Sequence, residues 1–195
     1  MDTKHTLPRS PELMSADTTA LLVVDIQVKL VRHITNSENV VWNSGRLADA
    51  AAVLGIPVLA TEQYPRGLGD TVPELADKLP DRPEKLTFSC GGCEPMVAAL
   101  SASDATQVLL CGIESHVCVQ QTAFDLMAAG YRVFVAADAV SSRYAMDHQT
   151  ALRRMESAGA TITTTESALF EWCERAGTPE FKAISQIVRE TGPAF

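Results

Sequence analysis

The sequence predicts an α/β domain in which a parallel β-sheet is covered by helices on both faces. Two observations predict this fold. Short apolar runs of strand length alternate with segments whose apolar residues recur at helical spacing. A glycine separates the end of a helical segment from the next apolar run at Leu54-Gly55-Ile56, at Ala129-Gly130-Tyr131 and at Ala158-Gly159-Ala160, as expected where a helix ends and a strand begins.

The first expected strand, at 19–26, is mostly Ala, Leu and Val and contains Asp25 near its end, which suits a strand buried on both faces. Residues 1–17 carry the breakers Pro8, Ser10 and Pro11 and are expected to form an N-terminal arm before one domain at 18–195. Further strands are expected at 56–60, 106–112, 131–137 and 161–165, and helices at 44–54, 94–100, 117–129, 144–158, 167–173 and 179–189.

The composition fits a single soluble domain. The chain has 195 residues, of which 46 % are apolar and 21 % charged, so a mainly disordered chain is excluded. A net charge of −8 argues against general binding to nucleic acid or to anionic membrane surfaces. No apolar run approaches the length of a membrane span, the N-terminus lacks the apolar region of a signal peptide, and the five cysteines favour reduced thiols. The sequence therefore predicts a cytoplasmic protein.

Functional sites in parallel sheets lie at the carboxyl ends of the strands, so polar residues there are the first candidates. Asp25 is costly to bury unless it is paired, although a helix N-cap would also explain it. Cys118 follows a strand and a turn and lies near the start of a helix, where the dipole and the free N–H groups favour a thiolate. A packed, inert cysteine is the alternative interpretation. Lys85, considered alone, has the features of a solvated surface charge.

Cys90 and Cys93 form a Cys-x-x-Cys pair without a second pair or matched histidines, so a metal site is not supported. A redox role for the two thiols stays open, because the pair precedes an expected helix. His116, two residues before Cys118, is interpreted as a turn or pocket residue rather than a general base.

Three segments, in order, resemble the isochorismatase-like cysteine hydrolase family. They are Leu21-Leu22-Val23-Val24-Asp25-Ile26-Gln27, then Lys85-Leu86-Thr87-Phe88-Ser89, then Gly112-Ile113-Glu114-Ser115-His116-Val117-Cys118-Val119, where Ser115 replaces the family's Thr. Residues 61–69 and 138–143 are most similar to the subgroup of isochorismatase-domain-containing proteins, and the resemblance spans about residues 18–190.

The resemblance implies a three-layer αβα sandwich with a central, mainly parallel sheet and a catalytic triad of Asp25, Lys85 and Cys118. Asp25 would take the thiol proton, Lys85 would hold both partners, and Cys118 would attack an amide or ureido carbonyl to form a thioester. It also implies a cis peptide at Ile113-Glu114, whose turn would direct the N–H groups of Glu114 and Cys118 toward an oxyanion.

The sequence differs from the family pattern in some features, and these differences limit the activity that the resemblance implies. The Asp-x-His and His ligands of metal-binding relatives are missing, so neither metal nor cofactor is expected, and Cys118 argues against vinyl-ether cleavage. The expected partners are a small-molecule substrate and further copies of the chain, from dimer to octamer. Two alternatives stay open: an idle member that acts through association, and a redox protein using Cys90 and Cys93. The residues expected to line the pocket are Gln27, Gln63, Tyr64, Phe88, Glu114 and His116.

Overall fold

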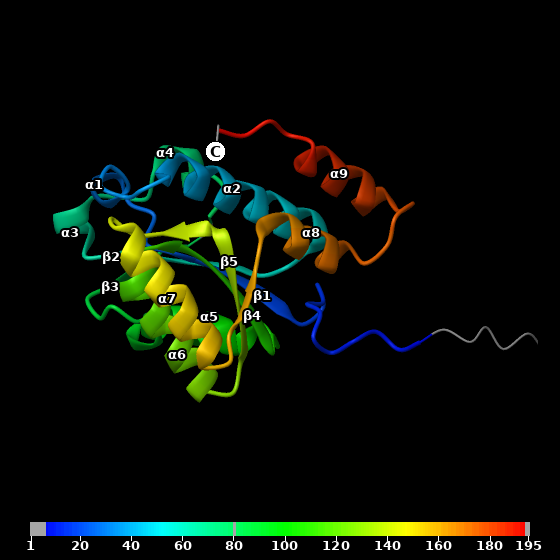
Figure 1. Ribbon diagram of the computed structural model, residues 1–195, viewed down its shortest axis with the longest axis horizontal. Coiled ribbons are helices and arrows are strands. Elements are labelled where there is room, and N and C mark those ends of the chain that lie inside the picture. Colours follow the sequence, from blue (N-terminus) through cyan, green and yellow to red (C-terminus); the bar gives the residue numbers. More distant parts are fainter. Residues whose placement is uncertain (1–6, 80, 194–195) are drawn as a thin grey trace, which may run out of the picture.

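The computed structural model describes residues 7–79 and 81–193. Within them, the chain forms one sheet in the order β3-β2-β1-β4-β5-β6, with every neighbouring pair parallel (Figure 1). The predicted α/β fold is therefore confirmed, and the sheet is wholly parallel. The strands are β1 (Thr19–Val24), β2 (Val58–Gln63), β3 (Glu84–Lys85), β4 (Gln107–Ile113), β5 (Arg132–Ser141) and β6 (Thr161–Thr163).

Helices cover the sheet on both faces because β1 presents apolar side chains to both. Leu21 and Val23 belong to one buried cluster, while Leu22 and Val24 belong to the other. The first cluster packs under α2 (Ser37–Leu54), α8 (Thr165–Cys173) and α9 (Pro179–Val188). The second packs under α5 (Glu94–Ala102), α6 (Gln120–Ala128) and α7 (Ala145–Ser157). The three layers of the predicted sandwich are visible in Figure 1.

The remaining elements are short and lie in the connections. These are α1 (Val28–Val31), α3 (Pro65–Leu68), α4 (Pro73–Ala76), the 3₁₀ turn η1 (Cys90–Gly92) and the π-helical turn η2 (Ser115–Val119). In the described part of the chain, no helix has the length and apolar character needed to cross a membrane.

Several expected boundaries are corrected. The helix expected at 44–54 begins at Ser37, and the strand expected at 131–137 continues to Ser141. The strand expected at 56–60 runs instead over Val58–Gln63. The strand expected at 161–165 ends at Thr163, because Thr164 caps α8 by accepting a hydrogen bond from the N–H of Ser167.

The expected N-terminal arm lies partly outside the described residues, which begin at Leu7. Met14, within the arm, is fully buried, and its N–H donates to the carboxylate of Glu171 on α8 at 2.8 Å. The second half of the arm therefore packs against the domain.

β1 and β4 meet closely at their carboxyl ends, where Val24 pairs with Gly112. Gly112 has a φ of +117°, and a Cβ built on it would lie 2.1 Å from the carbonyl oxygen of Val24. Glycine alone fits this position, so the chain can turn directly from β4 into the segment that carries Cys118.

Candidate functional site

Asp25 lies one residue beyond β1 in a left-handed conformation, with a φ of 52°, and its side chain is fully buried. Such a conformation is uncommon for a residue other than glycine, although Asp tolerates it better than most. The hydroxyl of Thr61, from the adjacent β2, donates to Oδ1 of Asp25 at 2.8 Å. The ammonium of Lys85 lies 2.7 Å from Oδ2. The buried carboxylate is therefore both paired and hydrogen-bonded.

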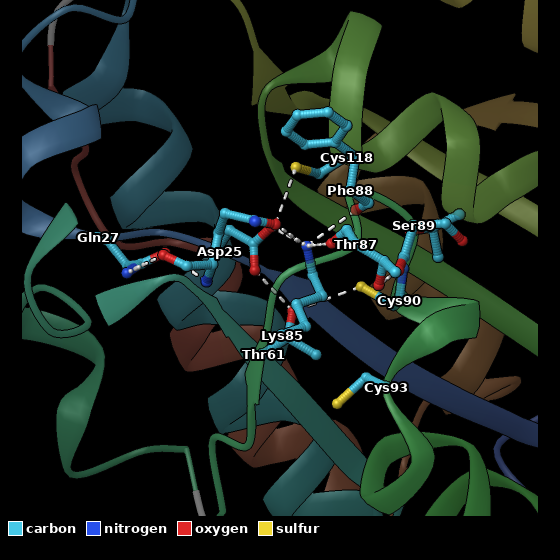
Figure 2. A network of polar contacts seen from close by, with 12 residues as sticks. Asp25, Gln27, Thr61, Lys85, Thr87, Phe88, Ser89, Cys90, Cys93 and Cys118 are labelled. Atoms are coloured by element: carbon cyan, nitrogen blue, oxygen red, sulfur yellow. Dashed lines mark hydrogen bonds and ion pairs between the residues drawn. The ribbon is translucent and has the colours of Figure 1, made fainter. Parts of the chain in front are cut away.

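Lys85 ends the two-residue strand β3, which pairs with the end of β2. Its ammonium donates to Oε1 of Gln63 at 2.6 Å, to the carbonyl of Phe88 at 2.8 Å and to that of Thr87 at 3.2 Å. Burial is the largest single influence on the pKa of Lys85 and works to lower it. The charge of Asp25, the nearby Cys90 and Cys118, and the direct contact with Asp25 together outweigh burial, so the pKa lies above its ordinary value. Lys85 is therefore a permanently charged group between strand ends (Figure 2).

Cys118 lies in η2, a single π-helical turn that leads into α6. Its Sγ lies 4.0 Å from Oε1 of Gln63, the same oxygen that accepts from Lys85. Burial raises the pKa of the Cys118 thiol, the charge of Asp25 raises it further, and Lys85 opposes them only in part. This direction is opposite to the one expected from a position at a helix start, because burial and the charge of Asp25 both favour the protonated thiol.

Gln27 was expected to line the substrate pocket, but its side chain contacts the backbone of Gln63 instead. It is fully buried, and its Nε2 donates to the carbonyl of Gln63 at 3.0 Å while its Oε1 accepts from the N–H of Gln63 at 2.7 Å. Nε2 also lies 2.5 Å from the carbonyl of Gly69. Because these contacts occupy its amide, Gln27 positions Gln63, whose own amide joins Lys85 to the region of Cys118.

The turn between β4 and Cys118 is fixed by the β5–α7 connection. The peptide bond Ile113–Glu114 is cis, at the position where the resemblance implies one. The carboxylate of Glu114 accepts hydrogen bonds from Arg143, including one of 2.9 Å from Nη2, so it forms a salt bridge rather than facing a pocket. Oγ of Ser115 lies 3.0 Å from Nδ1 of His148, and Nδ1 of His116 lies 3.0 Å from Oγ of Ser142.

Tyr64 and Phe88 follow β2 and Lys85 respectively, and each is about half exposed. Tyr64 has a φ of 37°, a second strained residue at a strand end. These side chains present apolar surface near the carboxyl edge of the sheet.

The Cys-x-x-Cys pair does not have the character of a reactive redox site. Cys90 and Cys93 are free thiols, both buried, and burial raises the pKa of Cys90 to about 11. Within the described ranges, no three His, Cys, Asp or Glu side chains gather in a way that could hold a metal ion.

Asp25, Lys85 and Cys118, which the sequence singled out, lie close together (Figure 2). Lys85 joins the three, because its ammonium contacts Asp25 directly and shares the side-chain oxygen of Gln63 with Cys118. Sequence reasoning missed the contacts of Thr61, whose place at a strand end was the available signal. It also missed the contact of Cys90 with the Thr61 hydroxyl, 3.4 Å from its Sγ, because no local pattern indicates this long-range contact.

Comparison with known proteins finds similarity to proteins with an isochorismatase domain. A family model described as the isochorismatase domain matches residues 19–167. Isochorismatase domain-containing protein 2 from Danio rerio is 39 % identical over 180 residues, covering 92 % of this chain and 91 % of the relative. The secreted isochorismatase effector Isc1 from Phytophthora sojae is 40 % identical over 177 residues, covering 87 % of this chain and 84 % of that protein.

Solved structures agree with the fold. A structure titled MAR1 ribonuclease from Caenorhabditis elegans matches with a TM-score of 0.86 and 38 % identity, covering 93 % of this chain and 95 % of that one. The ycaC gene product of Escherichia coli, described as an octameric hydrolase of unknown specificity, matches with a TM-score of 0.77 and 27 % identity, covering 87 % and 85 % of the two chains.

Proposed function

Because this chain belongs to the isochorismatase family, we propose that it is a metal-independent cysteine hydrolase that cleaves a C–N bond of a small amide or ureido substrate. The observation that carries the proposal is the position of Lys85. Its ammonium lies 2.7 Å from the Asp25 carboxylate and 2.6 Å from the Gln63 oxygen that faces Cys118. A nucleophile, a base and a fixed positive charge therefore meet in one buried site.

In the first step, the thiol of Cys118 gives its proton to Asp25 as its sulfur attacks the carbonyl carbon of the substrate. The C–S bond forms, and the electron pair of the C=O bond moves to the oxygen. We assign stabilisation of this oxyanion to the backbone N–H groups of Glu114 and Cys118. Lys85 keeps its charge throughout, so the proton moves between Cys118 and Asp25 beside a fixed cation.

In the second step, the electron pair returns from the oxygen and the C–N bond breaks. The leaving nitrogen takes the proton from Asp25 and departs as ammonia or an amine, which leaves a thioester on Cys118. Water then gives a proton to Asp25 and attacks the thioester carbon. The C–S bond breaks, the acid is released, and Asp25 returns the proton to the sulfur.

The electrostatics support a base-assisted attack. Because burial and Asp25 raise the pKa of Cys118, the thiol is neutral at rest and needs a base at the moment of attack. The arrangement does not require a metal ion to generate the nucleophile, since the sulfur itself attacks.

The test is a panel of primary amides and ureido compounds, with released ammonia as the first measurement. Rapid acid quenching and intact-mass spectrometry are the second, because an acyl group on Cys118 adds a defined mass. We expect ammonia release and the adduct in the wild type, and neither in Cys118→Ala. Wild-type protein that releases ammonia as fast as Cys118→Ala would refute the mechanism.

Self-association is a second candidate role, favoured by the octameric state described for the Escherichia coli relative. We propose that this chain also forms homo-oligomers, which sedimentation velocity would detect. An assembled protein without turnover on any amide or ureido compound would favour the idle, interacting member of the family. An RNA substrate belongs in the panel because one similar structure is titled a ribonuclease, although a net charge of −8 does not favour a polyanion.

A reducing, cytoplasmic location is our proposal for this chain. It rests on the five free cysteines, four of them buried. The relative from Phytophthora sojae is named as secreted, so fractionation of the source cells is the direct test.

A further inference from the structure

The two oxygens of the Asp25 carboxylate have different partners. Oδ1 accepts a hydrogen bond of 2.8 Å from the Thr61 hydroxyl, whereas Oδ2 faces the ammonium of Lys85 at 2.7 Å. Apart from that ion pair, Oδ2 accepts no hydrogen bond from the residues that the structure describes. One oxygen is therefore occupied by a hydroxyl proton, and the other keeps a free lone pair inside the site.

Counting protons fixes the direction of the next contact. A threonine hydroxyl has one proton, and Thr61 donates it to Asp25. Oγ1 of Thr61 lies 3.4 Å from Sγ of Cys90, so in this contact the thiol is the donor and the hydroxyl oxygen the acceptor. Burial raises the pKa of Cys90 to about 11, so its thiol holds the required proton at neutral pH.

Cys90 is itself held in place. It is fully buried, and its backbone N–H donates to Oγ1 of the fully buried Thr122 on α6 at 2.9 Å. A continuous donor chain thus runs from Cys90 through Thr61 to Oδ1 of Asp25, whereas the ammonium of Lys85 contacts Oδ2 (Figure 2).

We propose that Thr61 and Cys90 are positioning residues that hold Oδ1 of Asp25 as a fixed acceptor and leave Oδ2 as the oxygen that takes the proton of Cys118. This inference rests on the proposed role of Asp25 as the base. Protonation of Oδ1 would break the bond from Thr61, whereas protonation of Oδ2 keeps the whole chain. A hydrogen bond to a charged group is worth about 10- to 100-fold in an equilibrium, so the bond from Thr61 disfavours protonation of Oδ1 by about that factor.

The chain has a second consequence that can be measured. A donor aimed at a carboxylate favours its ionised form. For any reaction that depends on this base, removal of that donor should move the acidic limb of the pH–rate profile to higher pH. The shift corresponds to about one to two pH units for the bond strength given above.

The experiment measures the rate constant of Cys118 alkylation by iodoacetamide from pH 4 to 10, resolved by peptide mass spectrometry. Alkylation needs no knowledge of the substrate. Thr61→Val keeps the shape of the side chain and removes the hydroxyl, whereas Thr61→Ser keeps the hydroxyl and removes a methyl. We expect the acidic limb to move up by about one to two pH units in Thr61→Val and to stay in place in Thr61→Ser.

Cys90 offers a second matched pair. Cys90→Ala removes the donor and should move the acidic limb in the same direction by a smaller amount. Cys90→Ser keeps a donor, so its acidic limb should lie at the wild-type pH. Cys93→Ala, another buried thiol in the same segment, should leave the limb unchanged. A purely packing role gives the reverse order for Thr61, because there the serine variant loses more contact than the valine variant.

Asp25→Asn separates this inference from the proposed function. The acidic limb should vanish in that variant, since the base is gone. A limb that persists in Asp25→Asn would overturn both the base and the positioning chain. A limb that vanishes there but stays unmoved in Thr61→Val, or moves equally in Thr61→Ser, would overturn the positioning chain alone.

Discussion

Lys85 and Asp25 form an ion pair of 2.7 Å in which the two side chains are 1 % and 0 % exposed to solvent. Burial of two charges carries a large desolvation cost, which is offset only when the remaining donors and acceptors are also satisfied. Lys85 meets this condition through the oxygen of Gln63 and the carbonyl of Phe88, and Asp25 meets it through Thr61. The pair is therefore a connected part of the site, and its loss should have two separable effects, on stability and on reactivity.

The first prediction concerns the stability of this pair. Lys85→Met leaves the Asp25 carboxylate buried without its counter-charge, and the free energy of unfolding should fall by about 3–5 kcal/mol. Urea denaturation at pH 7 measures it. The double variant Asp25→Asn/Lys85→Met should recover part of that loss, because no unpaired charge is left. A loss in the double variant equal to the sum of the losses in Asp25→Asn and Lys85→Met would show that the two charges are not coupled.

The second prediction concerns Gln27, which serves the backbone of Gln63 rather than the substrate. Gln27→Leu removes the partners of a buried N–H and a buried carbonyl, at about 1–3 kcal/mol for each unsatisfied group. Unfolding in urea should detect this loss, together with a slower alkylation of Cys118 as Gln63 shifts. Gln149→Leu, at an exposed position of α7, is the control and should stay within about 0.5 kcal/mol of the wild type. Equal stability of the two variants would contradict the assigned role of Gln27.

The long elements of the fold could be predicted from the sequence because their signals are local. Apolar runs such as Leu21 to Val24 and the glycines after helices each belong to a single segment. The short elements could not be predicted, because long-range contacts define them. β3, for example, has two residues and exists because Lys85 pairs with Gln63.

The site divides in the same way. Asp25, Lys85 and Cys118 were identified through the family resemblance, since each residue alone also fitted a structural role. Glu114 was expected to line the pocket, and the position of Arg143 places its carboxylate in a salt bridge instead. The raised pKa of Cys118 could not be predicted from its place at a helix start, because it depends on burial and on Asp25 across the sheet.

The third prediction concerns alkaline pH. Burial raises the pKa of Cys111 from 9.0 to about 12 and that of Cys90 from 9.0 to about 11. Between pH 9 and these raised pKa values, the two thiols keep their protons in the folded protein but lose them in the unfolded chain. Their contribution to stability is therefore complete below pH 9 and declines as the pH rises above it. Each thiol contributes at most about 1.4 kcal/mol per pH unit.

Cys111→Ala tests this prediction. The variant should lose about 1 kcal/mol at pH 7 through a small cavity in β4, yet its stability should decline less steeply than that of the wild type between pH 9 and 10.5. Urea midpoints across this range give the two slopes. Parallel curves for variant and wild type would exclude Cys111 as a contributor to the decline.

The fourth prediction concerns Gly112, whose absent side chain lets β4 lie against β1 and turn into the segment of Cys118. A Cβ there would lie 2.1 Å from the oxygen and 2.7 Å from the nitrogen of Val24, both in the backbone of the central strand, which has no room to move. Gly112→Ala should therefore cost more than about 4 kcal/mol or prevent folding. Gly130→Ala is the matched control, since Gly130 also has a positive φ, of +93°, but a Cβ there meets nothing within 4 Å. That variant carries the backbone strain alone, about 1–2 kcal/mol. Thermal and urea unfolding of both variants separate the cost of the contact with Val24 from the cost of the backbone conformation. Equal losses of stability would mean that the conformation, and not the contact with Val24, requires glycine at position 112.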